Sequence, residues 1–150
     1  MGWLLLLAVL AVSRSSAVQE AVRRLAVSLR GKLVQLELWA IGGGFYLRAD
    51  AASAFASMRA QALSEGVALQ VNSAWRTREQ QKALYDDYVS GRRSAVAAPP
   101  GYSNHEGGTA VDVETAWGTN AAYLWLSANA HRFGFSRTVP DEPWHWEYTA

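Results

Sequence analysis

Apolar and polar residues alternate with different periods in successive stretches of the chain, and these periods predict both helices and strands. In residues 18–30 the larger apolar side chains recur at helical spacing, at Val18, Val22, Leu25 and Leu29. We therefore expect a helix over 18–30. Residues 33–41 alternate as a half-buried strand does, and glycines 42–44 predict a turn into a second strand over 45–49.

Three further stretches begin at a residue that caps helices and end at a glycine, which predicts a helix in each. The expected helices cover residues 51–65, 78–90 and 121–133, with N-caps at Asp50, Thr77 and Asn120 and final glycines at Gly66, Gly91 and Gly134. The second of these starts with a capping-box pattern, because Gln80 follows Thr77 by three positions.

Short alternating stretches predict the remaining strands, at 67–73, 109–113 and 142–148. Helices and strands follow each other irregularly. The sequence lacks the glycine-rich turn between a strand and a helix that is typical of a nucleotide-binding fold. We expect the α+β class, with a small, mostly antiparallel sheet flanked by helices. A chain of 150 residues, half of them hydrophobic, can bury one core, so residues 18–150 are predicted to form a single domain.

The composition excludes several classes of function. The 14 Lys and Arg residues are nearly balanced by 13 Asp and Glu and form no basic stripe, so nucleic acid is not an expected partner. The absence of cysteine removes a thiol nucleophile, a cysteine-ligated zinc site and a disulfide framework. Neither Lys32 nor Lys82 has a serine three positions before it, which excludes the Ser-x-x-Lys arrangement of active-serine peptidases.

The first residues of the chain indicate export. Residues 3–12 are all apolar, but this run is too short to span a bilayer, which takes about 20 residues as a helix. It resembles the apolar centre of a secretory signal, with Ser15 and Ala17 as small residues before a cleavage point, although no Lys or Arg precedes it. We expect residues 1–17 to be a signal-like segment and the protein to be exported, to the periplasm or cell wall; the alternative is a helix that packs on the domain.

Two of the three histidines lie in short motifs that also contain acidic residues. His105 and Asp112 are seven positions apart, an odd offset that would place them on opposite faces of one straight strand. They can converge on a metal ion only if the chain bends between them, at Gly107 and Gly108. His145 would complete a catalytic zinc site, which takes three protein ligands and leaves one position open.

From the residues alone, a structural role for each group stays open. A single histidine beside a strand is more often a hydrogen-bonded structural residue than a ligand, and Asp112 alone could pair with a cation. His131, near the end of its predicted helix, is interpreted as a partner of the negative helix terminus.

Three ordered motifs decide between these interpretations. The stretch SNHEGGTAVD matches S-x-H-x-x-G-x-A-x-D, and EPWHWE matches E-x-W-H-x-E. The earlier stretch SAWRTREQQ is similar to S-G-Y-R-S-x-E-Q-Q, with Ala74 and Trp75 in place of glycine and tyrosine. Over residues 33–149 the sequence resembles the zinc D-alanyl-D-alanine carboxypeptidases of the VanY type, within the group that includes lysostaphin-like enzymes and the hedgehog fold.

This resemblance implies a role for each matching residue, and the implied zinc ligands are His105, Asp112 and His145. Glu142 would be the general base, which takes a proton from water and returns it to the leaving amine. Arg76 would face the scissile carbonyl and stabilise the oxyanion. Ser103 would help to hold the substrate. Two nearby residues each have a second interpretation: Trp144 would either wall the substrate cleft or pack in the core, and Glu147 would be either a supporting acid or a solvated charge.

The resemblance further implies a function and a partner. We expect a zinc peptidase that acts on peptidoglycan stem peptides as a D,D-carboxypeptidase, removing the terminal D-alanine with zinc-activated water, and that is monomeric. The first alternative is an endopeptidase of the same family that cuts an L-Ala-D-Glu bond or a cross-bridge. The second is a non-catalytic zinc-containing binding module, which the presence of both Glu142 and Arg76 disfavours.

Overall fold

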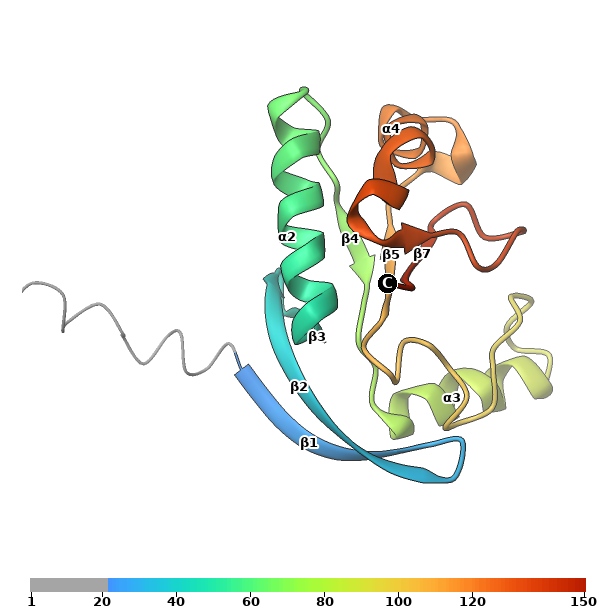
Figure 1. Cartoon of the computed structure of the whole chain (residues 1–150). Coiled ribbons are helices and arrows are strands. Elements are labelled where there is room, and N and C mark those ends of the chain that lie inside the picture. The colour runs from blue at the N-terminus through green and yellow to red at the C-terminus, as the bar shows by residue number, and fades with distance from the viewer. Residues whose placement is uncertain (1–21) are drawn as a thin grey trace, which may run out of the picture.

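The computed structural model describes residues 22–150, and the predicted signal-like segment 1–17 lies outside them. The described chain starts with a long hairpin of β1 (Val22–Leu29) and β2 (Lys32–Gly42), followed by β3 (Phe45–Arg48). These strands form an antiparallel sheet in the order β1-β2-β3. The hairpin curves beneath the rest of the molecule in Figure 1. The strands predicted over 33–41 and 45–49 are confirmed.

The prediction of a helix over 18–30 is wrong for residues 22–29, which form β1. Burial there alternates, with Leu25, Val27 and Leu29 half-buried and the residues between them exposed. A separation of four residues, as from Leu25 to Leu29, satisfies both the helical and the strand period, so the pattern was ambiguous. The turn decides: Arg30 and Gly31 both have positive φ, at 49° and 75°, a backbone suited to a two-residue hairpin.

A second antiparallel sheet carries two of the predicted ligands, Asp112 and His145. It contains β4 (Val71–Ser73), β5 (Ala110–Val113), β6 (Phe135–Ser136) and β7 (His145–Tyr148), in the order β4-β5-β7-β6. Its three predicted strands are all shorter than expected, and β5 starts at Ala110 rather than 109. β4 starts at Val71 rather than 67, and β7 starts at His145 because the amide of His145 closes a turn onto the Glu142 carbonyl at 3.1 Å.

The helices lie close to their predicted positions: α2 (Ala49–Ser64), α3 (Arg78–Val89) and α4 (Ala121–Asn129), with short 3-10 turns η1 (Ala116–Gly118) and η2 (Ala130–Phe133). The capping box of Thr77 and the Asn120 cap are confirmed. Asp50 is not the N-cap of α2, which is Arg48. Asp50 lies in the first turn, where it accepts the amide of Ala51 and pairs with Arg48 at 2.7 Å.

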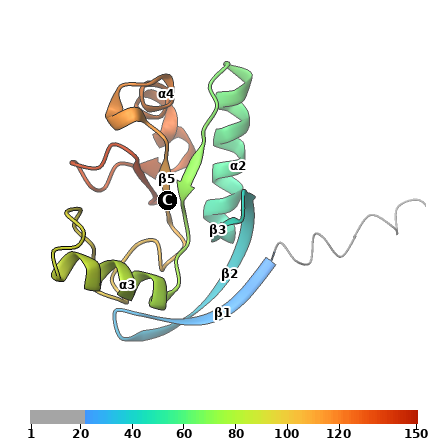
Figure 2. The same cartoon turned by 180° about the vertical axis from the view of Figure 1, so that it is seen from behind.

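The main core forms between α2 and the second sheet. Phe55 and Met58 of α2 are fully buried, and the Phe55 ring meets Phe135 edge to face at 6.1 Å between centroids. Figure 2 shows α2 beside the strands, with α4 towards one end of the sheet and α3 towards the other. Val111 and Trp146 belong to this core, so one face of β5 and β7 is buried and the other is free to form a site.

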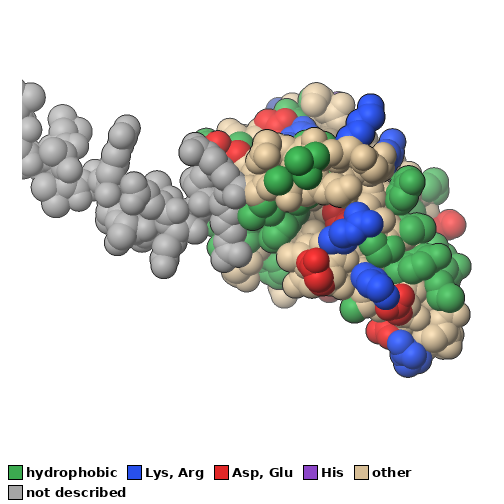
Figure 3. All heavy atoms as spheres, turned by 90° about the horizontal axis from the view of Figure 1, so that it is seen from below, with side chains coloured by type: hydrophobic (Ala, Val, Ile, Leu, Met, Phe, Trp, Pro, Cys, Tyr) green, Lys and Arg blue, Asp and Glu red, His purple; other side chains and the backbone are tan. Residues whose placement is uncertain are grey.

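The expected α+β class with small antiparallel sheets and flanking helices is confirmed. Among residues 22–150, no helix combines the length and apolarity that crossing a membrane requires. Positive and negative side chains are interspersed with apolar ones on the face that Figure 3 shows. The single domain over 18–150 and the monomeric state stay predictions.

Candidate active site

The pairing of β5 with β7 brings two of the predicted ligands together. Asp112 lies directly opposite His145 in this antiparallel ladder, and directly paired residues project from the same face of a sheet. Their neighbours Val111 and Trp146 also pair, and both are buried in the core on the opposite face. The strands therefore direct an aspartate and a histidine to one side while their alternate residues anchor the sheet.

The turn before β5 supplies the third ligand. His105 is buried, and its Nδ1 lies 2.7 Å from the carbonyl oxygen of Ala74. An Nδ1–H that donates to this carbonyl leaves Nε2 unprotonated and facing Asp112. Gly108 bends the chain with φ +71°, and its carbonyl accepts the Arg48 amide at 2.8 Å. The predicted bend is confirmed at Gly108, whereas no left-handed φ occurs at Gly107.

The three side chains converge on one point. His105 Nε2 lies 3.4 Å from Asp112 Oδ1, His145 Nδ1 lies 3.2 Å from the same oxygen, and one ligand atom from each residue falls within 4.8 Å of the others. The two imidazole rings are 5.2 Å apart between centroids. All three side chains are at least four-fifths buried, with exposed fractions of 7%, 16% and 6% in chain order.

The charge state of this cluster suits a cation. Burial by itself would raise the pKa of Asp112, but hydrogen bonds and charge interactions with His105 and His145 outweigh it and hold this pKa well below 3.8. The carboxylate therefore stays ionised at neutral pH. Two imidazole nitrogens and one carboxylate oxygen form the donor set of a catalytic zinc site with an open coordination position. The residues present fit a divalent metal ion.

Glu142 and Arg76 line the same cleft as these ligands. Glu142 Oε2 lies 3.9 Å from His145 Nδ1, and about a quarter of the Glu142 side chain is exposed. The carboxylate thus lies beside the cluster and still faces solvent, as a base that exchanges protons with water must. Pro143 and Trp144 separate it from His145 in an extended turn rather than a helix.

Arg76 is held in place by neighbours that the motif analysis did not single out. Its Nη1 donates to Gln81 Oε1 at 2.7 Å and its Nη2 to Ser73 Oγ at 3.0 Å. Gln81, fully buried on α3, donates in turn to the Ala98 carbonyl. Burial lowers the pKa of Arg76, against the charges of Asp112, Glu106 and Glu142. The sequence did contain a signal for these partners, because Ser73 and Gln81 occupy matching positions of the motif S-G-Y-R-S-x-E-Q-Q.

Three other predicted residues also lie near the cleft. Ser103 and Trp144 line it, and Ser103 Oγ accepts the amide of His105 at 3.3 Å. Glu147 accepts a hydrogen bond from Asn104 at 2.7 Å, so it braces the turn that carries His105. Its role as a supporting acid stays a prediction. His131 is exposed and does not line the cleft.

Glu106 is a further residue that the sequence did not reveal. It is 3% exposed, and its carboxylate accepts the amides of Gly101 and Ser103, at 2.7 and 3.3 Å for Oε2. This closes the loop on which Ser103 and His105 lie. A buried carboxylate inside the motif thus supports the site without facing the ligands.

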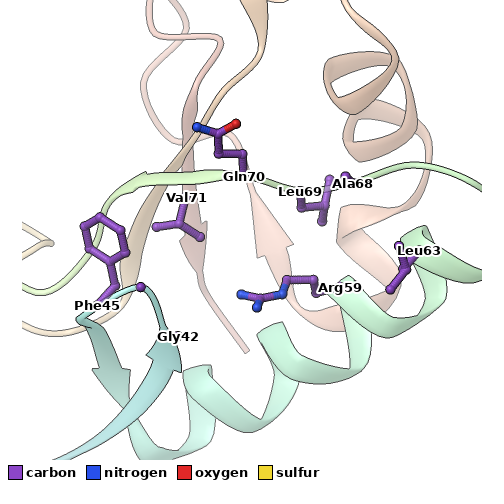
Figure 4. Close-up of a pocket in the computed structure, with 9 residues that line it drawn as sticks. Gly42, Phe45, Arg59, Leu63, Ala68, Leu69, Gln70 and Val71 are labelled. Carbon is purple, nitrogen blue, oxygen red and sulfur yellow. The ribbon is translucent and has the colours of Figure 1, made fainter.

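A separate hollow between α2 and the β3 and β4 strands offers no comparable chemistry (Figure 4). Among its lining residues, Arg59 carries the one ionisable side chain, and its guanidinium donates to the Ile41 carbonyl at 2.7 Å. It shares no lining residue with the cleft of the histidines. The histidine cleft is therefore the candidate active site.

Comparison with known proteins agrees with this geometry. The family model VanY, described as D-alanyl-D-alanine carboxypeptidase, matches residues 44–150 and so includes every candidate site residue. The chain belongs to the VanY family. A D-alanyl-D-alanine carboxypeptidase of Enterococcus faecalis (strain ATCC 700802 / V583) is 35% identical over 114 residues, covering 58% of this chain and 42% of that protein.

Three solved carboxypeptidase or peptidase structures are similar to most of the chain. A mutant of the vancomycin-resistance D,D-pentapeptidase VanY in complex with Zn(II) superimposes with a TM-score of 0.66 and 28% identity, covering 77% of this chain and 79% of that one. VanYB in complex with D-alanine-D-alanine superimposes with a TM-score of 0.67 and 28% identity, covering 77% of this chain and 78% of that one. The LD-carboxypeptidase LdcB superimposes with a TM-score of 0.60 and 33% identity, covering 70% of this chain and 60% of that one. The chain spans between 39% and 46% of the length of its curated relatives.

Proposed function

We propose that the protein is a zinc D,D-carboxypeptidase that removes the terminal D-alanine from peptidoglycan stem peptides. The observation that carries this proposal is the convergence of His105, Asp112 and His145 in one cleft with Glu142 and Arg76. The VanY-family relatives with Zn(II) and with D-alanine-D-alanine support the metal and the substrate. A pure binding module would need no base and no oxyanion partner, and both are present.

The residues of the chain divide the reaction among them. His105, Asp112 and His145 would hold zinc, which polarises a carbonyl oxygen and lowers the pKa of a bound water from 15.7 to about 7. Glu142 accepts a proton from the attacking water as the new C–O bond forms. It then delivers this proton to the amine that departs as the C–N bond breaks.

Arg76 stabilises the charge that develops on the carbonyl oxygen during this step. Its guanidinium is already fixed by Gln81 and Ser73, so little reorganisation is needed when the charge appears. Ser103 and Trp144 line the cleft beside the ligands and are placed to contact the substrate.

A second arginine favours an exopeptidase over an endopeptidase. Arg93 lines the same cleft, and its Nε donates to the Ala95 carbonyl at 3.2 Å. Arg76 and Arg93 both line this cleft, so two guanidiniums border the same hollow. A carboxypeptidase must recognise a free carboxylate, and a guanidinium can bind one with two parallel hydrogen bonds. An endopeptidase cuts within a peptide, so its substrate has no free carboxylate next to the scissile bond.

Digestion of purified muropeptides by the zinc-loaded protein, with masses of the products, tests the proposal. We expect pentapeptide stems to lose one alanine. Release of whole stems or cleavage of cross-bridges would support the endopeptidase instead. Removal of D-alanine from tetrapeptide stems, with pentapeptides left intact, would assign the L,D-specificity that LdcB is named for.

The place of action follows from the substrate. We propose that the protein is exported and acts on peptidoglycan as a monomer, with residues 1–17 as the export signal. Fractionation of cells that express the full chain, followed by N-terminal sequencing of the exported form, tests this. Retention of the intact chain in the cytoplasm would contradict it.

A further inference from the structure

A second pocket adjoins the catalytic cleft. It has a volume of about 300 Å³ and is lined by Asn72, Ala95, Val113, Glu114, Thr115, Trp117 and Trp144. Trp144 lines both this pocket and the cleft, so the two hollows share a wall. The pocket contains one carboxylate and two indole rings, and none of the roles described above uses Glu114 or Trp117.

Trp117 is held in an unusual position. Its side chain is 79% exposed, yet its ring lies 4.8 Å from that of Trp144 between centroids, at an interplanar angle of 86°. Ala116 and Trp117 both have left-handed φ values, 44° and 57°, which residues with a Cβ rarely adopt. Such strain persists where surrounding structure imposes it, and it concentrates at ligand-binding sites.

The strained turn is braced against the segment that carries the catalytic base. Gly118 has φ +87°, and a Cβ built there would approach Pro143 Cβ to 3.3 Å. Pro143 lies between Glu142 and Trp144 in the chain. The turn therefore packs on the same segment that positions Trp144, and the two indole rings form perpendicular walls fixed relative to the cleft.

Glu114 supplies a fixed negative charge beside these walls. Its Oε1 accepts the Ala116 amide at 2.7 Å and its Oε2 accepts from Asn72 at 3.1 Å. These two hydrogen bonds fix the Glu114 carboxylate at the edge of the pocket. Within residues 22–150 no Lys, Arg or His forms a salt bridge with it.

Glu114 directly follows β5 and comes two residues after the candidate ligand Asp112, and its amide donates to the Gln70 carbonyl at 2.8 Å. Residues two apart in an extended chain lie about 7 Å apart on the same side, so this charge is near the reaction centre. An extended peptide substrate advances by the same rise per residue. A side chain one or two residues from the scissile bond can therefore reach the pocket.

We propose that this pocket binds the primary ammonium group of a substrate side chain, with Trp117 and Trp144 as aromatic walls and Glu114 as the counter-charge. Aromatic faces attract a cation through the ring quadrupole, and the carboxylate adds a direct ion pair. This inference rests on the proposed function, because the diamino acid of a stem peptide supplies such an amine next to the D-alanines. The pocket would thus select the third residue of the stem.

Paired peptides test this selection. Pentapeptide stems with lysine at the third position, either free or acetylated at Nζ, are hydrolysed by the zinc-loaded protein and by Glu114→Gln and Trp117→Ala. We expect the wild type to prefer the free amine about tenfold in kcat/KM, through KM. Both substitutions remove this preference by raising KM for the free amine. Glu79→Gln and Trp39→Ala, outside both hollows, serve as controls and keep it.

Other outcomes overturn the inference. Equal hydrolysis of both peptides by the wild type would show that the amine is not bound. An equal loss for both peptides in Trp117→Ala would mean that the indoles are an apolar platform, for an aliphatic chain or a sugar ring. Hydrolysis of acetylated D-Ala-D-Ala, which has no diamino acid, tests the proposed function separately.

Calorimetric binding of the tripeptide L-Ala-γ-D-Glu-L-Lys, free or acetylated at Nζ, tests the pocket without turnover. Tighter binding of the free amine by the wild type and not by Glu114→Gln supports the pocket even if no peptide is cleaved. Equal binding by both proteins refutes it even in an active enzyme.

Discussion

Asp112 and His145 face each other across the β5–β7 pairing, with 3.2 Å between Asp112 Oδ1 and His145 Nδ1. The contact depends on sheet register, because a slip of one residue would turn either side chain into the core. His105 is added by a turn whose histidine is bonded to the Ala74 carbonyl. Two candidate ligands are thus fixed by strands and the third by a braced turn.

Removal of one imidazole tests the metal site. His105→Ala leaves two of the three ligands, so we expect the purified protein to lose stoichiometric zinc, measured by atomic emission after dialysis, and to lose hydrolysis with it. His131→Ala is the matched control, because His131 is exposed and outside the cleft. Full zinc content in His105→Ala would mean that the ion is bound elsewhere.

Neutralisation of Glu142 separates the base from the metal ligands. Glu142→Gln keeps the shape of the side chain and removes its basicity, so we expect kcat to fall by about 10²–10⁴-fold while zinc content is unchanged. Asp141→Asn, one residue earlier and exposed, is the control. An unchanged kcat in Glu142→Gln would exclude this residue as the base.

Arg76→Lys tests the oxyanion role. Lysine keeps the charge but loses the fork that binds Gln81 and Ser73, so the cation is no longer oriented. We expect kcat to fall by about 10²–10³-fold, comparable to the loss of an oxyanion-hole donor, with zinc retained. Arg132→Lys, outside the cleft, is expected to match the wild type in steady-state assays. A rise in KM with constant kcat would indicate ground-state binding only.

Two adjacent glycines give a matched test of the bend before β5. A Cβ at Gly108 would lie 2.9 Å from the Arg48 amide nitrogen in a left-handed conformation, whereas at Gly107 the nearest contact is an ordinary 3.5 Å. We expect Gly108→Ala to lower the free energy of unfolding by about 1–3 kcal/mol and to weaken zinc binding, since His105 is displaced. Gly107→Ala is expected to change the free energy of unfolding and the zinc affinity little. Denaturant titration checks the pair, and equal effects would refute the account.

The depressed pKa of Asp112 predicts a pH dependence of the metal-free protein. Burial opposes ionisation, but His105 and His145 hold the folded-state pKa below 3.8, so the unfolded chain takes up the proton first. The contribution of Asp112 to the free energy of unfolding is complete well above pH 3.8 and is lost as pH falls through and below that value.

Chemical denaturation at several pH values measures this dependence. The stability difference between the wild type and Asp112→Asn is expected to shrink as pH falls from about 6 to about 3. A constant difference over this range would contradict the depressed pKa.

The sequence by itself determined the chemistry of the site. The resemblance of two motifs to those of the VanY-type carboxypeptidases named His105, Asp112 and His145 as candidate ligands and Glu142 as candidate base. Capping residues such as Thr77 and Asn120 set helix starts, since their hydrogen bonds reach only three residues along the chain.

Only the tertiary structure decided what depends on distant partners. The apolar spacing of β1 fits the period of a helix as well as that of a strand, and its antiparallel pairing with β2 selects the strand. Gln81 donates to the Ala98 carbonyl on a separate loop, and His105 is bonded to the distant Ala74 carbonyl. Trp117 meets Trp144 through packing between separate segments. Local hydrogen bonds and motif chemistry can be predicted from neighbouring residues, whereas register, burial and pocket walls arise when segments far apart in the sequence share one surface.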